Sequence, residues 1–300
     1  MTWKIIVIAH GSIAHLDEIP AFVREIRRGR PAPQELLDEL KERYTAIGGS
    51  PLLEETESIT ARLGEACNTP AFTAMRLSAP RITSVAEKLT PGDRICLVPA
   101  APFSVHIYAG AAQAALKEGG FEEFAETMAS VPPFGTAPQL VKAWSGEIIK
   151  ALEKTPEASV LLTAHSLPQM LIDRGDPYAT FFENAVAAVT EELDSWAKTQ
   201  GLTPPAVELA YQSQGAQAGA WLGPTLESKL QKVRDAGQRE VIVSPIGFLS
   251  EHVETLYDLD IEAAAWAKEM GLHLTRIPTV GGSDLLIEAV AELVKTTMAE

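Results

Sequence analysis

Two segments in the second half of the sequence carry side chains that can exchange protons and bind metal ions. The first is Thr163–Ser166, where an apolar run that precedes the segment leads to His165. Imidazole exchanges protons near neutral pH and also binds divalent metals. A histidine at the end of a strand can equally serve only to hydrogen-bond a neighbouring loop, so the local residues leave a catalytic and a structural role both open.

The second segment carries a row of carboxylates. Glu254, Asp258 and Glu262 recur four residues apart, so on a helix they share one face. A solvated acidic face is the simplest interpretation, although like charges at this spacing destabilise a helix. The row also follows a strand end that carries His252, and it lacks the Lys or Arg partners of a solvated helix. Oxygen ligands on successive turns suit a hydrated divalent cation, and a π-bulge is compatible with the segment.

A cluster of arginines lies nearer the amino terminus, at Arg27, Arg28 and Arg30. Guanidinium groups pair with carboxylates, so the cluster can hold an acidic ligand. Pairing with acidic residues of the next helix explains any one of these arginines equally well. The turn Gly48–Ser50 follows, in which Ser50 can cap the next helix or line a ligand site.

The elements that must position these residues alternate between strands and helices, which predicts parallel βαβ units. The expected strands are 4–9, 71–77, 94–99, 122–130, 159–164, 206–211, 240–245 and 273–277. The expected helices are 19–28, 33–47, 53–65, 107–118, 138–153, 181–199, 224–236, 252–270 and 282–298.

The two halves of the chain resemble each other. Ile8–Ser12 is similar to Leu162–Ser166, and each segment delivers an Ala–His pair at the end of a strand. We therefore expect an α/β protein of two Rossmann-like, doubly wound lobes with parallel sheets, residues 1–150 and 151–282, with an active-site cleft between them. The last helix, 283–300, can pack back on the first lobe.

Histidines concentrate at the expected strand ends. His10, His106, His165 and His252 all lie there, and ligands of open α/β sheets bind beyond the carboxyl ends of the strands. Trp221 also follows a strand; it can stack on a flat ligand or, more simply, anchor the next helix.

Composition excludes several classes of function. The 300 residues carry a net charge of −15, which argues against nucleic acid and against a polybasic membrane anchor. No signal peptide and no apolar stretch of spanning length occurs, so we expect a cytoplasmic protein without a membrane span. Neither a GxGxxG nor a Walker motif supports nucleotide chemistry. The two cysteines, Cys67 and Cys96, cannot supply the four thiolates of an iron–sulfur cluster within one chain.

Over nearly its whole length the sequence resembles the ferrochelatases. The segments that carry the resemblance are 26–31, 42–52, 164–168, 175–178, 211–215, 221–224 and 245–262, in the same order as in that family. The similarity is greatest to the soluble, monomeric Gram-positive-type enzymes, which act on coproporphyrin III. It implies the chelatase fold and insertion of ferrous iron into a porphyrin in haem biosynthesis. Coproporphyrin III is the favoured substrate, with protoporphyrin IX or a sirohydrochlorin-type reaction as alternatives.

The resemblance also implies roles for individual residues. His165 and Glu254 match the catalytic histidine and glutamate, and with Asp258 and Glu262 they are the expected metal-binding residues. Which of the catalytic two takes the proton and which meets the iron stays open. The expected porphyrin pocket comprises His10, Arg27, Arg28, Arg30, Ser50 and Trp221.

The position of His10 departs from the family pattern, because the Gram-positive branch usually has a tyrosine there. His10 is therefore a possible ligand of the product iron. The expected partners are the porphyrin and ferrous iron, with no further cofactor and no iron–sulfur cluster, and we expect a monomer with transient haem-pathway partners. A haem carrier of the same fold is a further alternative, and the presence of both His165 and Glu254 argues against it.

Overall fold

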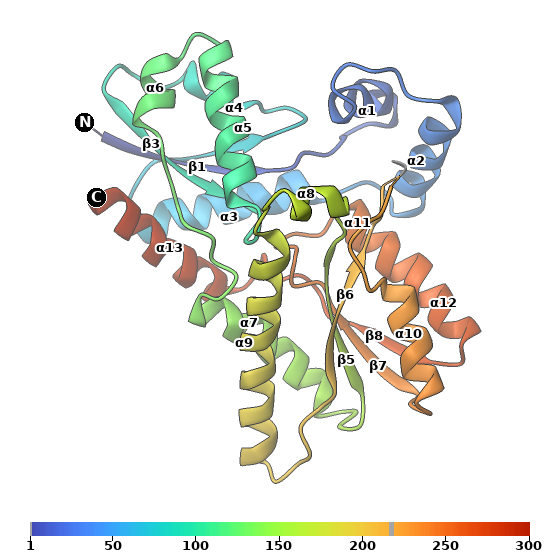
Figure 1. Cartoon of the computed structure of the whole chain (residues 1–300). Coiled ribbons are helices and arrows are strands. Elements are labelled where there is room, and N and C mark those ends of the chain that lie inside the picture. The colour runs from blue at the N-terminus through green and yellow to red at the C-terminus, as the bar shows by residue number, and fades with distance from the viewer. Residues whose placement is uncertain (1, 216–218) are drawn as a thin grey trace. The chain divides into compact units, whose positions relative to one another are not determined.

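The computed structural model describes residues 2–215 and 219–300, and the chain forms two compact units. The first comprises Met1–Phe134, Ser250–Val253 and Gly281–Glu300, and the second comprises Gly135–Leu249 and Glu254–Val280. Each unit contains one parallel sheet with helices on both faces, as the ribbons of Figure 1 show. The predicted α/β class and doubly wound parallel sheets are thus confirmed.

The sheet of the first unit is built from apolar runs that are buried on both faces. Its strands are β1 (Thr2–Ala9), β2 (Ala71–Met75), β3 (Asp93–Pro99) and β4 (Ala129–Ser130), in the order β2-β1-β3-β4. All pairs are parallel. The side chains of Ile5 to Ala9 are at most 2% exposed, which is typical of a central strand covered by helices on either side.

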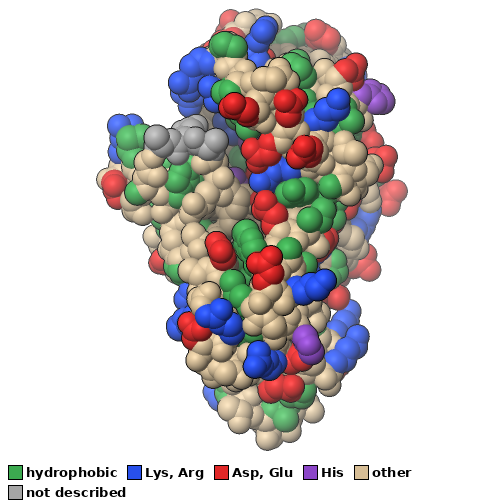
Figure 2. Space-filling model, turned by 90° about the vertical axis from the view of Figure 1, so that its right-hand side faces the viewer, with side chains coloured by type: hydrophobic (Ala, Val, Ile, Leu, Met, Phe, Trp, Pro, Cys, Tyr) green, Lys and Arg blue, Asp and Glu red, His purple; other side chains and the backbone are tan. Residues whose placement is uncertain are grey.

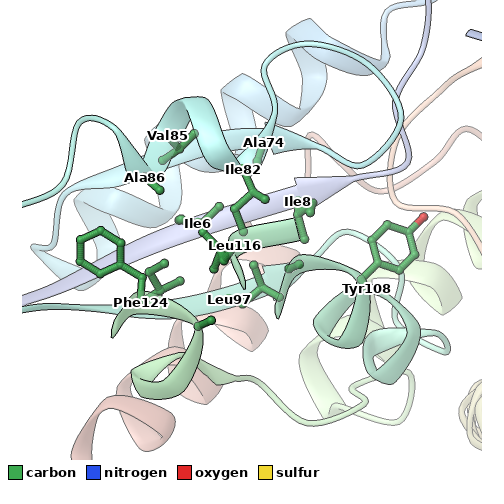
Figure 3. Packing of buried hydrophobic residues seen from close by; sticks show 13 residues of the cluster. Ile6, Ile8, Ala74, Ile82, Val85, Ala86, Leu97, Tyr108, Leu116 and Phe124 are labelled. Atoms are coloured by element: carbon green, nitrogen blue, oxygen red, sulfur yellow. The ribbon is translucent and has the colours of Figure 1, made fainter. Parts of the chain in front are cut away.

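Helices cover both faces of this first sheet. They are α3 (Leu52–Cys67), α4 (Ile82–Ala86), α5 (Val105–Glu118), α6 (Glu122–Thr127) and α13 (Asp284–Ala299). The other helices of this unit, η1 (Leu16–Glu18), α1 (Ile19–Ile26) and α2 (Gln34–Ala46), pack on one another. Helices α4, α5 and α6 pack on the face that Ile6, Ile8 and Leu97 present, and Figure 3 shows this cluster. Helices α3 and α13 contact each other and the strands of the same sheet, so α13 is part of the first unit's core.

One expected strand is wrong. The segment 122–130 was expected to be extended, but it forms α6 followed by the two-residue strand β4. The reason is the spacing of its apolar residues: Phe121, Phe124, Ala125 and Met128 lie three, four and seven residues apart, which suits one face of a helix. Phe124 and Ala125 are buried in the cluster of Figure 3.

The second unit repeats the strand order of the first. Its strands are β5 (Ser159–His165), β6 (Val207–Gln212), β7 (Glu240–Ser244) and β8 (His273–Arg276), in the order β6-β5-β7-β8. In both sheets the first strand of the unit lies between the second and the third, and all pairs are parallel. The expected similarity in build between the two halves is therefore confirmed.

The second sheet is also covered on both faces. The helices are α7 (Pro138–Leu152), α8 (Gln169–Asp173), α9 (Tyr178–Thr199), α10 (Leu226–Asp235), α11 (Val253–Leu256), the π-helix η2 (Asp258–Ala263) and α12 (Ala264–Glu269). Helices α10, η2 and α12 bury apolar side chains on the face that Leu161 and Val243 present, whereas α7 and α9 contact each other and the strands. Because α7 packs with α9 and β7, it belongs to the second unit, which begins at Gly135 and not near residue 150.

Charged side chains of both signs lie on the surface. On the face shown in Figure 2, acidic and basic side chains are interspersed, with acidic residues in excess over the whole chain at 40 against 25. Among the described residues, no helix combines the length and the apolar character needed to cross a bilayer.

Candidate functional site

His165 is fixed at the carboxyl end of a central strand. It is the last residue of β5, which has β6 and β7 on its two sides. The hydroxyl of Tyr178, at the start of α9, donates a hydrogen bond of 2.8 Å to the backbone carbonyl of His165. The next residue, Ser166, donates its N–H to the carbonyl of Gln212 at 2.7 Å, which continues the ladder with β6 beyond the strand end. The strand end therefore has little freedom to move.

Glu254 lies directly against this histidine. The carboxylate, in the first turn of α11, approaches with Oε1 3.4 Å from Nε2 of His165. The two side chains are 30% and 33% exposed, so both are shielded yet reachable by a ligand. The structure thus brings together the two residues that the sequence singled out as catalytic, although His165 lies on β5 and Glu254 on α11.

Opposing effects act on the imidazole of His165. Burial by itself lowers the pKa, because the charged ring loses solvation, whereas the charge and hydrogen bond of Glu254 and the charge of Asp258 raise it. The result is a pKa above the ordinary histidine value. A proton that reaches His165 is therefore stabilised by the neighbouring carboxylate.

Two residues at the end of β6 form hydrogen bonds with Glu254 and Asp258, the two carboxylate-bearing residues that raise the pKa of His165. Gln212, the last residue of β6, donates from Nε2 to the backbone carbonyl of Glu254 at 2.7 Å. Ser213 adopts a positive φ of 59°, and its hydroxyl donates a short hydrogen bond to Oδ2 of Asp258. Sequence reasoning included these residues only as part of a matching segment and missed their contacts. The available signal was a polar Gln–Ser pair at the end of an apolar strand.

Two members of the carboxylate row, Asp258 and Glu262, lie on a π-helix that follows the α-helical turn of Glu254, which agrees with the expectation that a π-bulge fits this segment. Asp258 opens η2 and is only 6% exposed, and Glu262 lies further along the same helix and is half-buried. Among the described residues, no group of three or more His, Cys, Asp or Glu side chains is close enough to hold a metal ion. The structure therefore brings His165 and Glu254 together but does not gather Asp258 and Glu262 with them into one metal centre.

The arginine cluster forms a braced turn in the first unit. Helix α1 ends at Ile26, and Arg28 and Gly29 follow with positive φ values of 53° and 84°. Nε of Arg27 donates to the carbonyl of Pro31, and Nε of Arg30 donates to the carbonyl of Arg27, each at 3.2 Å. Arg28 and Arg30 are exposed. Their role toward a porphyrin stays a prediction, as does the cleft expected between the lobes.

Two more residues of the expected porphyrin pocket lie in the first unit. His10 follows β1, with Nδ1 3.4 Å from the hydroxyl of Tyr108, and the guanidinium of Arg76 lies 5.7 Å from the centre of the Tyr108 ring. Ser50 accepts the N–H of Leu52, the first residue of α3, at 3.4 Å, whereas Pro51 and not Ser50 is the N-cap residue of that helix. Iron ligation by His10 stays a prediction.

Trp221 is anchored beside the segment that follows His165. It forms an antiparallel bridge with Pro168, and its ring packs against Gly215, where an added Cβ would lie 2.8 Å from the ring. These contacts hold Trp221 against the chain at Pro168 and Gly215, and anchoring of the next helix stays a prediction. Stacking of Trp221 on a flat ligand stays a prediction.

Comparison with known proteins identifies a family. The family model described as Ferrochelatase matches residues 5–298. A ferrochelatase of Acidobacterium capsulatum is 34% identical over 97% of this chain and 93% of its own length. A ferrochelatase of Deinococcus radiodurans is 33% identical over 99% and 96%. The coproporphyrin III ferrochelatase of Geobacillus kaustophilus is 30% identical over 100% and 97%.

Solved structures with the same fold are more distant in sequence. SirB from Bacillus subtilis with Fe³⁺ aligns with a TM-score of 0.61 at 15% identity, covering 100% of this chain and 96% of that one. CbiX, described as the terminal enzyme for biosynthesis of siroheme in denitrifying bacteria, aligns with a TM-score of 0.59 at 14% identity, covering 98% of each chain. At these identities the likeness concerns the fold alone.

Proposed function

The chain belongs to the ferrochelatase family, whose enzymes insert ferrous iron into a porphyrin, and from this premise we propose that it uses coproporphyrin III. The observation that carries the catalytic part is the 3.4 Å approach of His165 Nε2 to Glu254 Oε1 at the carboxyl edge of the second sheet. Ligands of open α/β sheets bind at that edge.

The proposed reaction exchanges two pyrrole protons for one ferrous ion. His165, neutral before the reaction, accepts a pyrrole proton at Nε2, and the Glu254 carboxylate beside it stabilises the imidazolium that forms. The second proton leaves to solvent. The side chains of His165 and Glu254 alone would hold a metal ion loosely. Loose binding suits a metal that is a substrate, because tight binding before the reaction would raise the barrier to insertion.

One consideration favours coproporphyrin III. It carries more propionates than protoporphyrin IX, and Arg27, Arg28 and Arg30 offer guanidinium groups that pair with carboxylates. Relatives at about the same identity bear the names coproporphyrin III ferrochelatase and ferrochelatase, so the names alone do not decide between the porphyrins.

Anaerobic insertion of ferrous iron should be faster with coproporphyrin III than with protoporphyrin IX. One additional charge-assisted hydrogen bond is worth about 1.5–3 kcal/mol. We therefore expect kcat/KM to be roughly tenfold or more higher for coproporphyrin III than for protoporphyrin IX. Loss of porphyrin fluorescence measures both rates in parallel. Equal rates or a preference for protoporphyrin would overturn the substrate assignment, and insertion into sirohydrochlorin alone would overturn the proposed reaction.

Asp258→Ala should weaken the use of the metal. Asp258 is buried, and its carboxylate contributes to the charge around His165. Loss of the negative charge of Asp258 should weaken the attraction of the site for ferrous iron. We therefore expect the apparent KM for ferrous iron to rise by roughly tenfold, with a smaller change in the KM for porphyrin. Initial rates over a series of iron concentrations measure this change.

Asp260→Ala is the matched control for this variant. Asp260 lies two residues further along the same π-helix, but its carboxylate pairs with Arg276 at 2.7 Å and is 37% exposed. It should leave the KM for iron unchanged. If the KM for iron were also unchanged in Asp258→Ala, Asp258 would have no role in the use of iron, and the acidic row would have only a structural role.

A further inference from the structure

Gln212 is a buried side chain that bonds to the backbone of a distant segment of the chain. It is only 5% exposed, and its Nε2 donates at 2.7 Å to the backbone carbonyl of Glu254, 42 residues away in the sequence. A buried amide that bonds to a carbonyl fixes the backbone at that point. Breaking the bond is unfavourable, because the buried N–H and carbonyl lose this partner and water cannot replace it. The contact therefore holds the turn that carries the Glu254 carboxylate.

The same residue is tied to His165. In the parallel pairing of β5 and β6, His165 lies opposite Gln212. The carbonyl of Gln212 accepts the N–H of Ser166 at 2.7 Å, so the ladder extends one residue past the histidine. Gln212 thus bonds through its backbone beside one member of the catalytic pair and through its side chain to the other.

The helix that carries Glu254 needs such a tie. Helix α11 has only four residues, and it is followed by the π-helix η2, where Glu262 donates its N–H to the carbonyl of Tyr257 five residues earlier. The wider π register interrupts the regular α-helical ladder directly after the turn of Glu254. A contact from outside the helix therefore determines where this turn lies relative to the sheet.

We propose that Gln212 is a positioning residue for metal insertion, which sets the separation of the Glu254 carboxylate from the His165 imidazole by holding the Glu254 carbonyl to the end of β6. This inference rests on the proposed function, because Gln212 acts through Glu254. It requires only contacts within the second unit.

Gln212→Met tests the inference, because methionine has a similar length and no N–H donor. A displacement of about 1 Å can lower a rate by roughly 10²-fold, so we expect kcat to fall by about 10- to 100-fold with little change in the KM for porphyrin or ferrous iron. Rates are normalised to the fraction of protein that binds coproporphyrin. The matched control is Gln214→Met, two residues along the chain and exposed, which should keep its activity.

A double-mutant cycle separates positioning from a general structural effect. If Gln212 acts through Glu254, the double variant Gln212→Met, Glu254→Gln should be no slower than Glu254→Gln alone. A merely structural role would multiply the two losses and overturn the inference. Full activity of Gln212→Met beside a strongly slowed Glu254→Gln would also overturn it, while leaving the proposed function intact.

A second variant serves if Gln212→Met does not bind porphyrin. Gln212→Leu removes the N–H donor without adding a charge, so the same loss of kcat is expected. Normal kcat in a porphyrin-binding Gln212→Leu would overturn the inference. Full activity of Glu254→Gln, in contrast, would overturn the proposed function itself, so the two failures are distinguishable.

Discussion

His165→Ala should strongly slow insertion of ferrous iron while porphyrin binding persists. The variant removes the imidazole that lies 3.4 Å from Glu254 and with it the proposed acceptor of the pyrrole proton. Proton transfer by a positioned side chain contributes typically about 10²- to 10⁴-fold to a rate, and we expect a loss in this range. Anaerobic assays of porphyrin fluorescence with and without ferrous iron measure insertion and binding in the same sample.

The second sheet supplies an internal control for this variant. His273 and Glu240, the first residues of β8 and β7, form another His–Glu pair, with His273 Nδ1 2.8 Å from Glu240 Oε1. This pair lies at the amino edge of the sheet, away from the strand ends where ligands bind. His273→Ala should keep full activity. If His165→Ala behaved in the same way, the proposed role of His165 would be refuted.

Glu254→Gln should cause a comparable loss and also change the pH dependence of the remaining activity. In the wild-type protein the Glu254 carboxylate helps to hold the pKa of His165 above its ordinary value, against the effect of burial. The neutral base is then available only above that raised pKa, so the insertion rate should rise with pH through it. Without the carboxylate, burial lowers the pKa of His165, and the acidic limb of the profile should move to lower pH.

The pH–rate profile and the titration of the His165 ring by NMR both measure this shift. Glu240→Gln is the matched control, since it makes the same substitution in the other His–Glu pair and should leave the profile unchanged. A Glu254→Gln variant with wild-type rate and an unmoved acidic limb would show that the carboxylate takes no part in proton transfer.

The sequence predicted most of the sheet elements because their signal is local. A run such as Ile5–Ala9 is apolar at every position, as expected for a parallel strand covered on both faces. Short helices carry too few residues to show a period, so α4 and α8 were not foreseen. The segment 122–130 failed for a different reason: its apolar residues fit a helical face, and burial of Phe124 against the sheet decides the outcome.

For the candidate site, the residues were predictable and their supports were not. His165 and Glu254 stand out by type, by position after strands and by resemblance to a family. The contact from Gln212 to the Glu254 carbonyl joins residues 42 apart and depends on the final packing of β6 against the chain near α11. The polar Gln–Ser pair at the strand end marks the position but does not identify the partner, so only the folded structure reveals the bond.

The place of α13 in the first unit determines the order in which the chain can mature during translation. Its buried residues Leu286, Val290 and Val294 complete the core beside α3, and the ribosome makes them only after all strands of the second unit. Domains usually mature in the order of their synthesis. Here the unit that is started first keeps an uncovered apolar face until the other has been made, so nascent chains that stall before residue 284 expose this face to chaperones and proteases.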